Sequence, residues 1–339
     1  MKQVQITKKT PLLGPDGSVL VPGYCKTNLF EYDRAAIRAN PTRIKEWDFY
    51  QISDSRYTLQ MVFADISLGG MGNFTLFDRK TGERFEQLSV SPLTFGRLGL
   101  EPNTEEDHSL SKKGRGFSMG LVKRGRKRWL TYEGRIRGSA ANAHIELIEA
   151  PGHESLVMAV PFDTPGYFYY NQKMNCLPAK GVVTIGGRHI VFSPDDAFCV
   201  LDWGRGVWPY RGSWYWGNGS TWFDGRLFGF EIGWGFGDMS AATENMLFYD
   251  GRAHKIGAVF LQKDADDWMK PWVFSSDDGR FSFTMTPAYD NFTSSRVGPV
   301  GNVCHQVFGD WCGAAVLDDG TVLRVEKMLA FCEFSDNRW

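Results

Sequence analysis

The sequence of 339 residues predicts an all-β protein made of two tandem antiparallel barrels or strongly curved sheets. Two observations predict this class. Apolar and polar residues alternate with a period of two over many short stretches, which is typical of half-buried strands. Turn dipeptides recur between these stretches, and many short strands joined by such turns are typical of sandwiches and barrels. These dipeptides are Asp16-Gly17, Asp224-Gly225, Asp250-Gly251, Asp278-Gly279 and Asp319-Gly320.

The N-terminal part of the chain departs from this pattern. Residues 1–30 read as an irregular arm with a cluster of turn residues at 12–17. Residues 31–47 carry several alanines before Pro41 interrupts them, and we expect a short helix here. Alternating patterns then predict strands at residues 57–64, 74–78, 129–134 and 144–147.

The distribution of tryptophan predicts two domains. Only Trp47 and Trp129 precede residue 165, whereas the other ten of the twelve tryptophans follow it. We expect an N-terminal β domain at residues 1–165, with 152–165 as a connector, and a C-terminal β domain at 166–339 that carries a tryptophan-rich pocket.

Composition limits the partners and the compartment. The net charge of -1 gives no general attraction to nucleic acid or to an anionic membrane. No apolar run has the length of a membrane helix, and the N-terminus lacks an apolar signal core, so we expect a cytoplasmic protein without stable membrane insertion. The basic run at residues 123–128 favours a solvated hairpin tip over a nucleic-acid site, since no aromatic residues are interleaved with it. We expect free thiols at all six cysteines, which are Cys25, Cys176, Cys199, Cys304, Cys312 and Cys332. The sequence leaves open whether the protein forms a homodimer.

The strongest candidate for a functional site is the segment from Asp202 to Asp238, which is rich in tryptophan and glycine. Trp214, Trp216 and Asn218 share one face of an expected strand. On the next strand, Glu231 shares a face with glycines. That face is either a pocket floor or a place where a barrel wall bends. Charged residues in so apolar a stretch point to function, although Asp202 and Arg205 could also form a structural ion pair.

Two further clusters add candidates. Residues 169–175 alternate so that Tyr169, Asn171, Lys173 and Asn175 share one face, which suits either ligand binding or an exposed strand. His305 lies in a strand-like run and is either a structural histidine or an acid–base group. The candidate catalytic residues are Asp202, Glu231 and His305. The candidate binding residues are Tyr170, Lys173, Asn175, Arg205, Trp208, Tyr210, Trp214, Trp216, Asn218 and Asp238.

Several common motifs are absent from the sequence. There is no phosphate-binding loop, no dinucleotide-binding fingerprint and no G-x-S-x-G nucleophile elbow. The histidine spacing offers no zinc site. We therefore expect neither a metal nor a cofactor, and a small-molecule ligand as the partner.

Some of these segments resemble a bacterial family catalogued as domain of unknown function 2804. The resemblance covers nearly the whole chain, and the family name implies no activity. It is carried by residues 10–13, 169–173, 201–208, 214–216, 243–245 and 305–306.

A second resemblance is to the lipocalin-like carotenoid 1,2-hydratases. It is carried in order by Tyr169-Tyr170, two strands around Gly186-Gly187, and Asp202-Trp203-Gly204. This resemblance implies two tandem lipocalin-like (calycin-type) barrels, with Asp202 as a proton donor. Lys173 and Asn175 stand where that family has a histidine and a tryptophan, so the carotenoid reaction does not carry over.

Three functions are compatible with these patterns. The first is a cofactor-independent hydratase, lyase or isomerase, in which Asp202 is the acid, Glu231 or His305 the base, and Arg205 and Lys173 bind an anionic or carbonyl group. The second is a non-catalytic carrier of a lipid or aromatic molecule. The third is a carbohydrate-active enzyme with Asp202 and Glu231 as paired carboxylates.

Overall fold

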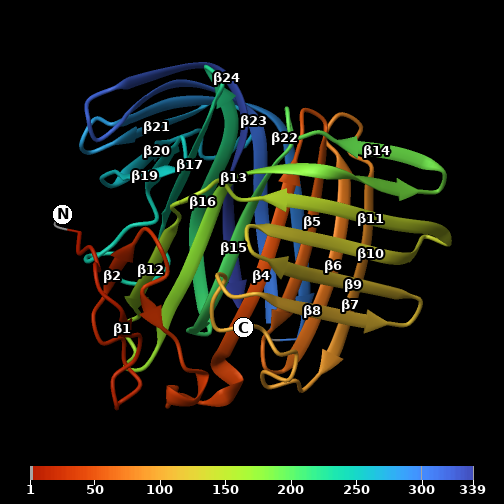
Figure 1. Ribbon diagram of the computed structural model, residues 1–339, viewed down its shortest axis with the longest axis horizontal. Coiled ribbons are helices and arrows are strands. Elements are labelled where there is room, and N and C mark those ends of the chain that lie inside the picture. The colour runs from red at the N-terminus through yellow and green to blue at the C-terminus, as the bar shows by residue number, and fades with distance from the viewer. Residues whose placement is uncertain (1–2, 299, 339) are drawn as a thin grey trace.

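The computed structural model describes residues 3–298 and 300–338, and 63% of the chain is in β-strands. Within these residues the strands form a 13-stranded sheet, a 9-stranded sheet and a small 2-stranded sheet. Every pairing in the two large sheets is antiparallel, as expected for strands joined by tight turns. The predicted all-β class with two tandem curved sheets is confirmed (Figure 1). The described residues include no helix long and apolar enough to cross a membrane.

The first sheet spans most of the N-terminal two thirds of the chain. Its main path is β7 (Arg84–Pro92), β6 (Gly69–Asp78), β5 (Tyr57–Asp65), β4 (Ile44–Ser53), β15 (Phe198–Val207), β13 (Phe168–Ile185), β11 (Ser139–Ile148), β10 (Lys127–Ile136), β9 (Phe117–Arg124) and β8 (His108–Gly114). Off this path, β12 (Leu156–Pro161) and β14 (Arg188–Phe192) pair with β13, and β2 (Gly23–Cys25) pairs with β12. Strands β1 (Thr10–Pro11) and β3 (Phe30–Glu31) form the small parallel sheet.

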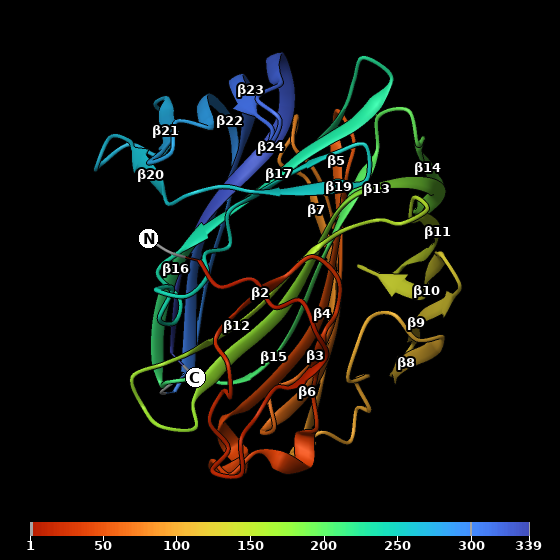
Figure 2. The same cartoon turned by 60° about the vertical axis from the view of Figure 1, so that its left-hand side comes forward.

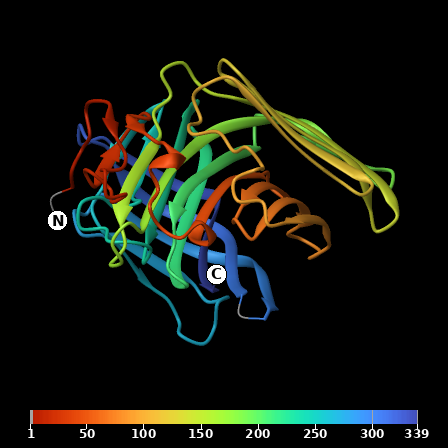
Figure 3. The same cartoon turned by 90° about the horizontal axis from the view of Figure 1, so that it is seen from below.

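The second sheet follows directly after β15. Its order is β19 (Arg252–Lys255), β18 (Met246–Tyr249), β17 (Arg226–Trp234), β16 (Arg211–Phe223), β24 (Val322–Arg338), β23 (Val300–Val316), β22 (Phe281–Val297), β21 (Trp272–Ser276) and β20 (Val259–Gln262). In Figure 2 the blue strands of this sheet lie across from the orange and green strands of the first. Seen from below, the yellow strands extend away to one side of the two sheets (Figure 3).

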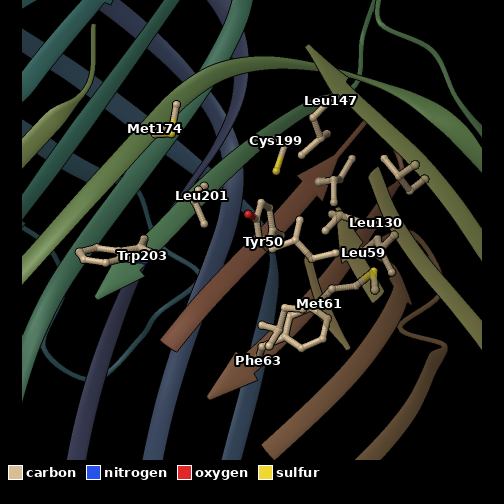
Figure 4. Close-up of a cluster of buried hydrophobic side chains, with 14 of the residues drawn as sticks. Tyr50, Leu59, Met61, Phe63, Leu130, Leu147, Met174, Cys199, Leu201 and Trp203 are labelled. Carbon is tan, nitrogen blue, oxygen red and sulfur yellow. The ribbon is translucent and has the colours of Figure 1, made fainter. Parts of the chain in front are cut away.

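Strands β13 and β15 separate two interiors, because both of their faces are buried. On β15, Cys199, Leu201 and Trp203 pack inside the first sheet with Tyr50 of β4 (Figure 4). The residues between them face the second sheet, as Val200 does when it packs in a cluster with Trp216. This alternation follows from the strand period of two, and it turns Asp202 toward the space between the sheets.

A β-bulge interrupts β13. The register of its pairing with β15 shifts between Met174 and Leu177, and Cys176 adopts a positive φ of 55°. Beyond this point β13 leaves β15 progressively and pairs with β11 and β14. A bulge bends a strand and re-aims its side chains, so one long strand can serve two parts of the sheet.

The short helix predicted within residues 31–47 is not found. Two 3-10 turns, Arg34–Ala36 and Pro41–Arg43, occupy part of this stretch, and β4 begins at Ile44. The Asp33 side chain accepts a hydrogen bond from the backbone N–H of Ala35, and Asn40 does the same for Thr42. These local hydrogen bonds and Pro41 favour single turns over a continuous helix.

Two other expectations concern the arrangement of the chain. The strand pairing divides it between Val207 and Arg211, since β13 and β15 belong to the first sheet, whereas domains at 1–165 and 166–339 stay a prediction. All six cysteines lie in described residues and are free.

Candidate functional site

A cavity of about 260 Å³ lies between the two sheets. The first sheet contributes β4, β5, β6, β13 and β15, and the second contributes β16, β23 and β24. Its walls are mostly aromatic, and their rings contact one another at centroid distances of 4.6 to 6.3 Å. These walls are formed by Trp47, Phe49, Tyr169, Trp208, Trp214, Trp216 and Phe236.

Lys173 and Asp202 form an ion pair at this cavity. They are directly opposite each other on β13 and β15, so both side chains leave the same face, and Lys173 Nζ lies 2.8 Å from Asp202 Oδ1. The ammonium also lies 4.3 Å from the centroid of the Trp216 ring. Burial alone would lower the pKa of Lys173, but the nearby carboxyls of Asp202, Glu244 and Glu231 raise it above its ordinary value. Lys173 therefore stays charged in the interior.

Glu244 reaches the cavity from the loop between β17 and β18. Its Oε1 accepts hydrogen bonds from Tyr169 Oη at 2.9 Å and from Asn171 Nδ2 at 2.9 Å. Its side chain lies against Gly233, where any larger residue would overlap the carboxylate. Burial raises the pKa of Glu244, and Lys173 opposes this effect.

Glu333 on β24 is a second buried carboxyl that lines the cavity. Its Oε1 accepts a hydrogen bond from Trp214 Nε1 at 3.2 Å, and its Oε2 accepts one from Gln306 Nε2 at 3.1 Å. Burial raises the pKa of Glu333 to about 7, although these hydrogen bonds and Lys173 lower it. At neutral pH this carboxyl can therefore both give and take a proton.

Glu231 lies behind the cavity wall and is fully buried. Trp216 Nε1 donates to Glu231 Oε1, and Asn218 Nδ2 donates to Oε2 at 2.9 Å. Asn175 Nδ2 lies 3.4 Å from the same Oε2, a weaker contact. Burial raises the pKa of Glu231 to about 8 despite the opposing effect of Lys173. Through its hydrogen bond Glu231 supports the position of Trp216 without lining the cavity itself.

The structure brings eight of the thirteen predicted site residues together. Asp202, Lys173, Trp208, Trp214 and Trp216 line the cavity. Three more of the predicted site residues lie directly behind Trp216 and are hydrogen-bonded to one another: Asn175, Asn218 and Glu231. Asn218 also lines a second cavity between the sheets, of about 490 Å³.

Tyr170 and Arg205 lie on the opposite face of the shared strands. They are directly opposite each other on β13 and β15. Because side chains alternate between the two faces of a strand, they point away from the face that carries Lys173 and Asp202. Arg205 is fully buried and ion-pairs with Asp48 at 3.0 Å, and Tyr170 donates to Asn28 Oδ1 at 2.9 Å. Arg205 therefore forms its ion pair with Asp48 rather than with Asp202.

The remaining three candidates lie away from the cavity. The ring centroid of His305 lies 4.0 Å from that of Trp268, on which it stacks, and its Nδ1 lies 2.7 Å from Asp290 Oδ2. Tyr210 is 38% exposed and contacts the Arg43 guanidinium. Asp238 is exposed, and its carboxylate accepts from the backbone N–H of Ser240.

Several residues of the cavity were not among the candidate site residues, although residues 243–245 were noted for the family resemblance. Tyr169 follows from the strand alternation stated above, which places it with Lys173 rather than with Tyr170. Glu244 carries no periodic signal because it lies in a loop. Glu333 lies 131 residues beyond Asp202 in the sequence, and only the pairing of β16 with β24 brings it to the cavity. Trp47 is accommodated because Gly204 opposite it has no side chain.

No group of three or more His, Cys, Asp or Glu residues in residues 3–298 and 300–338 is disposed to hold a metal ion. The charged groups of the cavity instead satisfy one another through ion pairs and hydrogen bonds.

The chain belongs to the family described as Domain of unknown function (DUF2804), whose model matches residues 3–339. Among solved structures it is similar to a Nitrosomonas europaea protein provisionally assigned as AttH, with 12% identity and a TM-score of 0.50, over 90% of this chain and 96% of that chain. It is also similar to kievitone hydratase from Nectria haematococca, with 9% identity and a TM-score of 0.48, over 97% of this chain and 98% of that chain. A search of curated proteins found no match. The first likeness supports the tandem β architecture.

Proposed function

We propose that this protein is a cofactor-independent enzyme of the hydratase, lyase or isomerase class that acts on a small, largely aromatic molecule. One observation carries the proposal: buried carboxyls with raised pKa values meet a lysine–aspartate ion pair at a cavity with aromatic walls. Apolar pockets with a few convergent polar groups are typical ligand sites, and perturbed titratable groups within them are typical of catalysis.

The aromatic walls select the substrate. Rings of Trp208, Trp214 and Phe236 contact one another edge to face and leave flat faces for an apolar or aromatic ligand. The cavity of about 260 Å³ suits a small molecule, because it lies just below the usual range for drug-sized ligands.

Each polar residue of the cavity has a separate proposed role in the reaction. Glu333, whose pKa is raised to about 7 by burial, is the proposed general acid. Lys173 holds a carbonyl oxygen of the substrate through an N–H group, and Asp202 keeps the ammonium in place. Glu244 is the proposed proton acceptor, because its Oε1 is already oriented by Tyr169 and Asn171. Asp202 thus acts as the partner of Lys173 instead of as the proton donor.

In the hydration direction the steps balance in atoms and charge. One carboxyl gives a proton to one carbon of a carbon–carbon double bond. A water molecule forms a C–O bond to the other carbon and loses a proton to the second carboxylate. Elimination is the reverse, and isomerisation needs only the removal of a proton and its return at another carbon.

Transfer of solvent deuterium to a probe tests this proposal. Benzylideneacetone, an enone with an aryl ring, offers an aromatic group, a double bond and a carbonyl. In D2O we expect the protein to catalyse C–D bond formation on this probe or on related aryl enones, observed by NMR. Glu333→Gln should reduce the rate at least about tenfold, because one positioned acid contributes about 10²–10⁴-fold.

A matched control separates the acid from a general charge effect. Glu326 lies on the same strand as Glu333 but is exposed, so Glu326→Gln should leave the rate unchanged. Equal rates in wild type and Glu333→Gln would refute the assigned acid. Binding of aryl enones, followed by tryptophan fluorescence, without any deuterium transfer would instead favour the non-catalytic carrier.

A further inference from the structure

The basic run at residues 123–128 is a hairpin between β9 and β10, but only part of it is solvated. Arg124, Arg126 and Lys127 are exposed, whereas Lys123 is 3% exposed and Arg128 is 1% exposed. The expectation of a solvated hairpin tip is therefore wrong for these two cations. They are directly opposite each other in the antiparallel pair, and like charges in that position destabilise a sheet.

Two carboxylates, Glu105 and Glu149, lie near the two cations, but only Arg128 has one of them within ion-pair distance. Glu149 forms an ion pair with Arg128 Nη1. Lys123 Nζ instead donates to the backbone oxygens of Glu105 at 2.8 Å and of Gly125 at 2.6 Å, and no described carboxylate lies within 4.0 Å of it. Burial and the Arg128 guanidinium lower the pKa of Lys123, although Asp107 and Glu105 oppose this. A buried cation in this position calls for an anion.

These cations line a separate cavity of about 260 Å³. Its floor is buried, and its rim is exposed at Thr27, Arg126 and Gly152, so a small solute can reach it. It shares no lining residue with the aromatic cavity, because Gln172 and Met174 point away from the face of β13 that carries Lys173.

Unused hydrogen-bond donors gather at the same cavity. Arg128 Nε meets no hydrogen-bond partner among the described residues, and neither do the two ring nitrogens of His153. Burial, reinforced by Arg128, lowers the pKa of His153 to about 4, although the backbone of Asn175 and the Glu154 carboxylate oppose this, so its ring is neutral and has one N–H. Buried donors without partners are rare in folded proteins and call for a ligand or bound water.

We propose that this cavity binds a small oxyanion, a carboxylate or a phosphate, through Lys123, Arg128 and His153. The anion balances the opposed cations and accepts hydrogen bonds from the unused donors, as charge-assisted hydrogen bonds do. The site lies apart from the aromatic cavity, so it does not depend on the function proposed above.

Calorimetric titration with inorganic phosphate and with acetate, at constant ionic strength in chloride, tests this site. We expect wild type to bind at least one of the two ions with 1:1 stoichiometry, and the preferred ion identifies the class. Lys123→Met should weaken binding at least about tenfold, since it removes the unbalanced ammonium. The matched control is Lys127→Met, which removes the same charge from the exposed face of the same hairpin and should bind as wild type does.

A second variant keeps the test decisive if Lys123→Met does not fold. His153→Phe retains an aromatic ring without its nitrogens and should also weaken binding several-fold. The absence of binding by both ions to wild type, with only water then filling the cavity, would overturn the proposal. Equal affinity in Lys127→Met and in every folded variant of Lys123 or His153 would overturn it as well.

Discussion

Replacing Lys173 by Met removes the ammonium that ion-pairs with Asp202 while keeping a flexible side chain of similar length. The two side chains are only 3% and 14% exposed, so solvent screens their interaction little. Removal of one member of a buried ion pair leaves an uncompensated charge and costs about 3–5 kcal/mol. We therefore expect the free energy of unfolding to fall by about that amount at pH 8.

The loss should depend on pH with a definite sign. Glu333 and Glu231 have pKa values raised to about 7 and about 8, and burial also raises the pKa of Glu244. Without the Lys173 ammonium these pKa values rise further. At pH 5 Glu231 and Glu333 are then protonated, so less charge repulsion remains. The variant should consequently lose less stability at pH 5 than at pH 8.

Urea unfolding followed by circular dichroism measures both values. The control is Lys127→Met, an exposed lysine paired with Glu146, which should change the free energy of unfolding by less than about 1 kcal/mol. The double variant Lys173→Met/Asp202→Leu should recover much of the loss, because a buried pair can be replaced by apolar residues. A loss that is the same at pH 5 and pH 8 would refute the assigned cluster of carboxyls.

Three further predictions concern neighbouring residues. The pKa of Glu231 is about 8 in the folded state and about 4.5 in the unfolded state, so its proton contributes fully to the free energy of unfolding below pH 4.5. This contribution is lost as the pH rises to 8. Urea unfolding of Glu231→Gln at a series of pH values should lack this part of the decrease in the free energy of unfolding. Gly233→Ala forces Glu244 to move and should lower the free energy of unfolding by about 1–3 kcal/mol in the same assay, while an unchanged value would show that the contact is loose. His305→Phe should leave deuterium transfer to aryl enones unchanged, since His305 lies away from the cavity, and a loss of rate would contradict that placement.

The alternation of side chains between the two faces of a strand predicted those parts of the site that depend on a single strand. It placed Trp214 and Trp216 on one face of β16, and it placed Glu231 on the face of β17 that carries the glycines, as the structure has them. The same rule separates Tyr169 from Tyr170. The choice of Tyr170 as a binding residue did not follow that rule.

Contacts between the sheets could not be read from local patterns. Glu333 and Gln306 enter the site through the pairing of β23 with β24 and of β24 with β16, which no single strand encodes. The helix expected at residues 31–47 failed for another reason, because caps at Asp33 and Asn40 compete with helix formation over so short a distance.

The titration of Glu333 tests the central claim most directly, because it requires no ligand. Side-chain carboxyl carbons of glutamate, labelled with ¹³C, report protonation by NMR, and the signal absent from Glu333→Gln assigns the residue. We expect a midpoint at about pH 7, as burial among aromatic walls dictates. A midpoint near the ordinary value of about 4.5 would contradict the assignment of this cavity as an acid–base site.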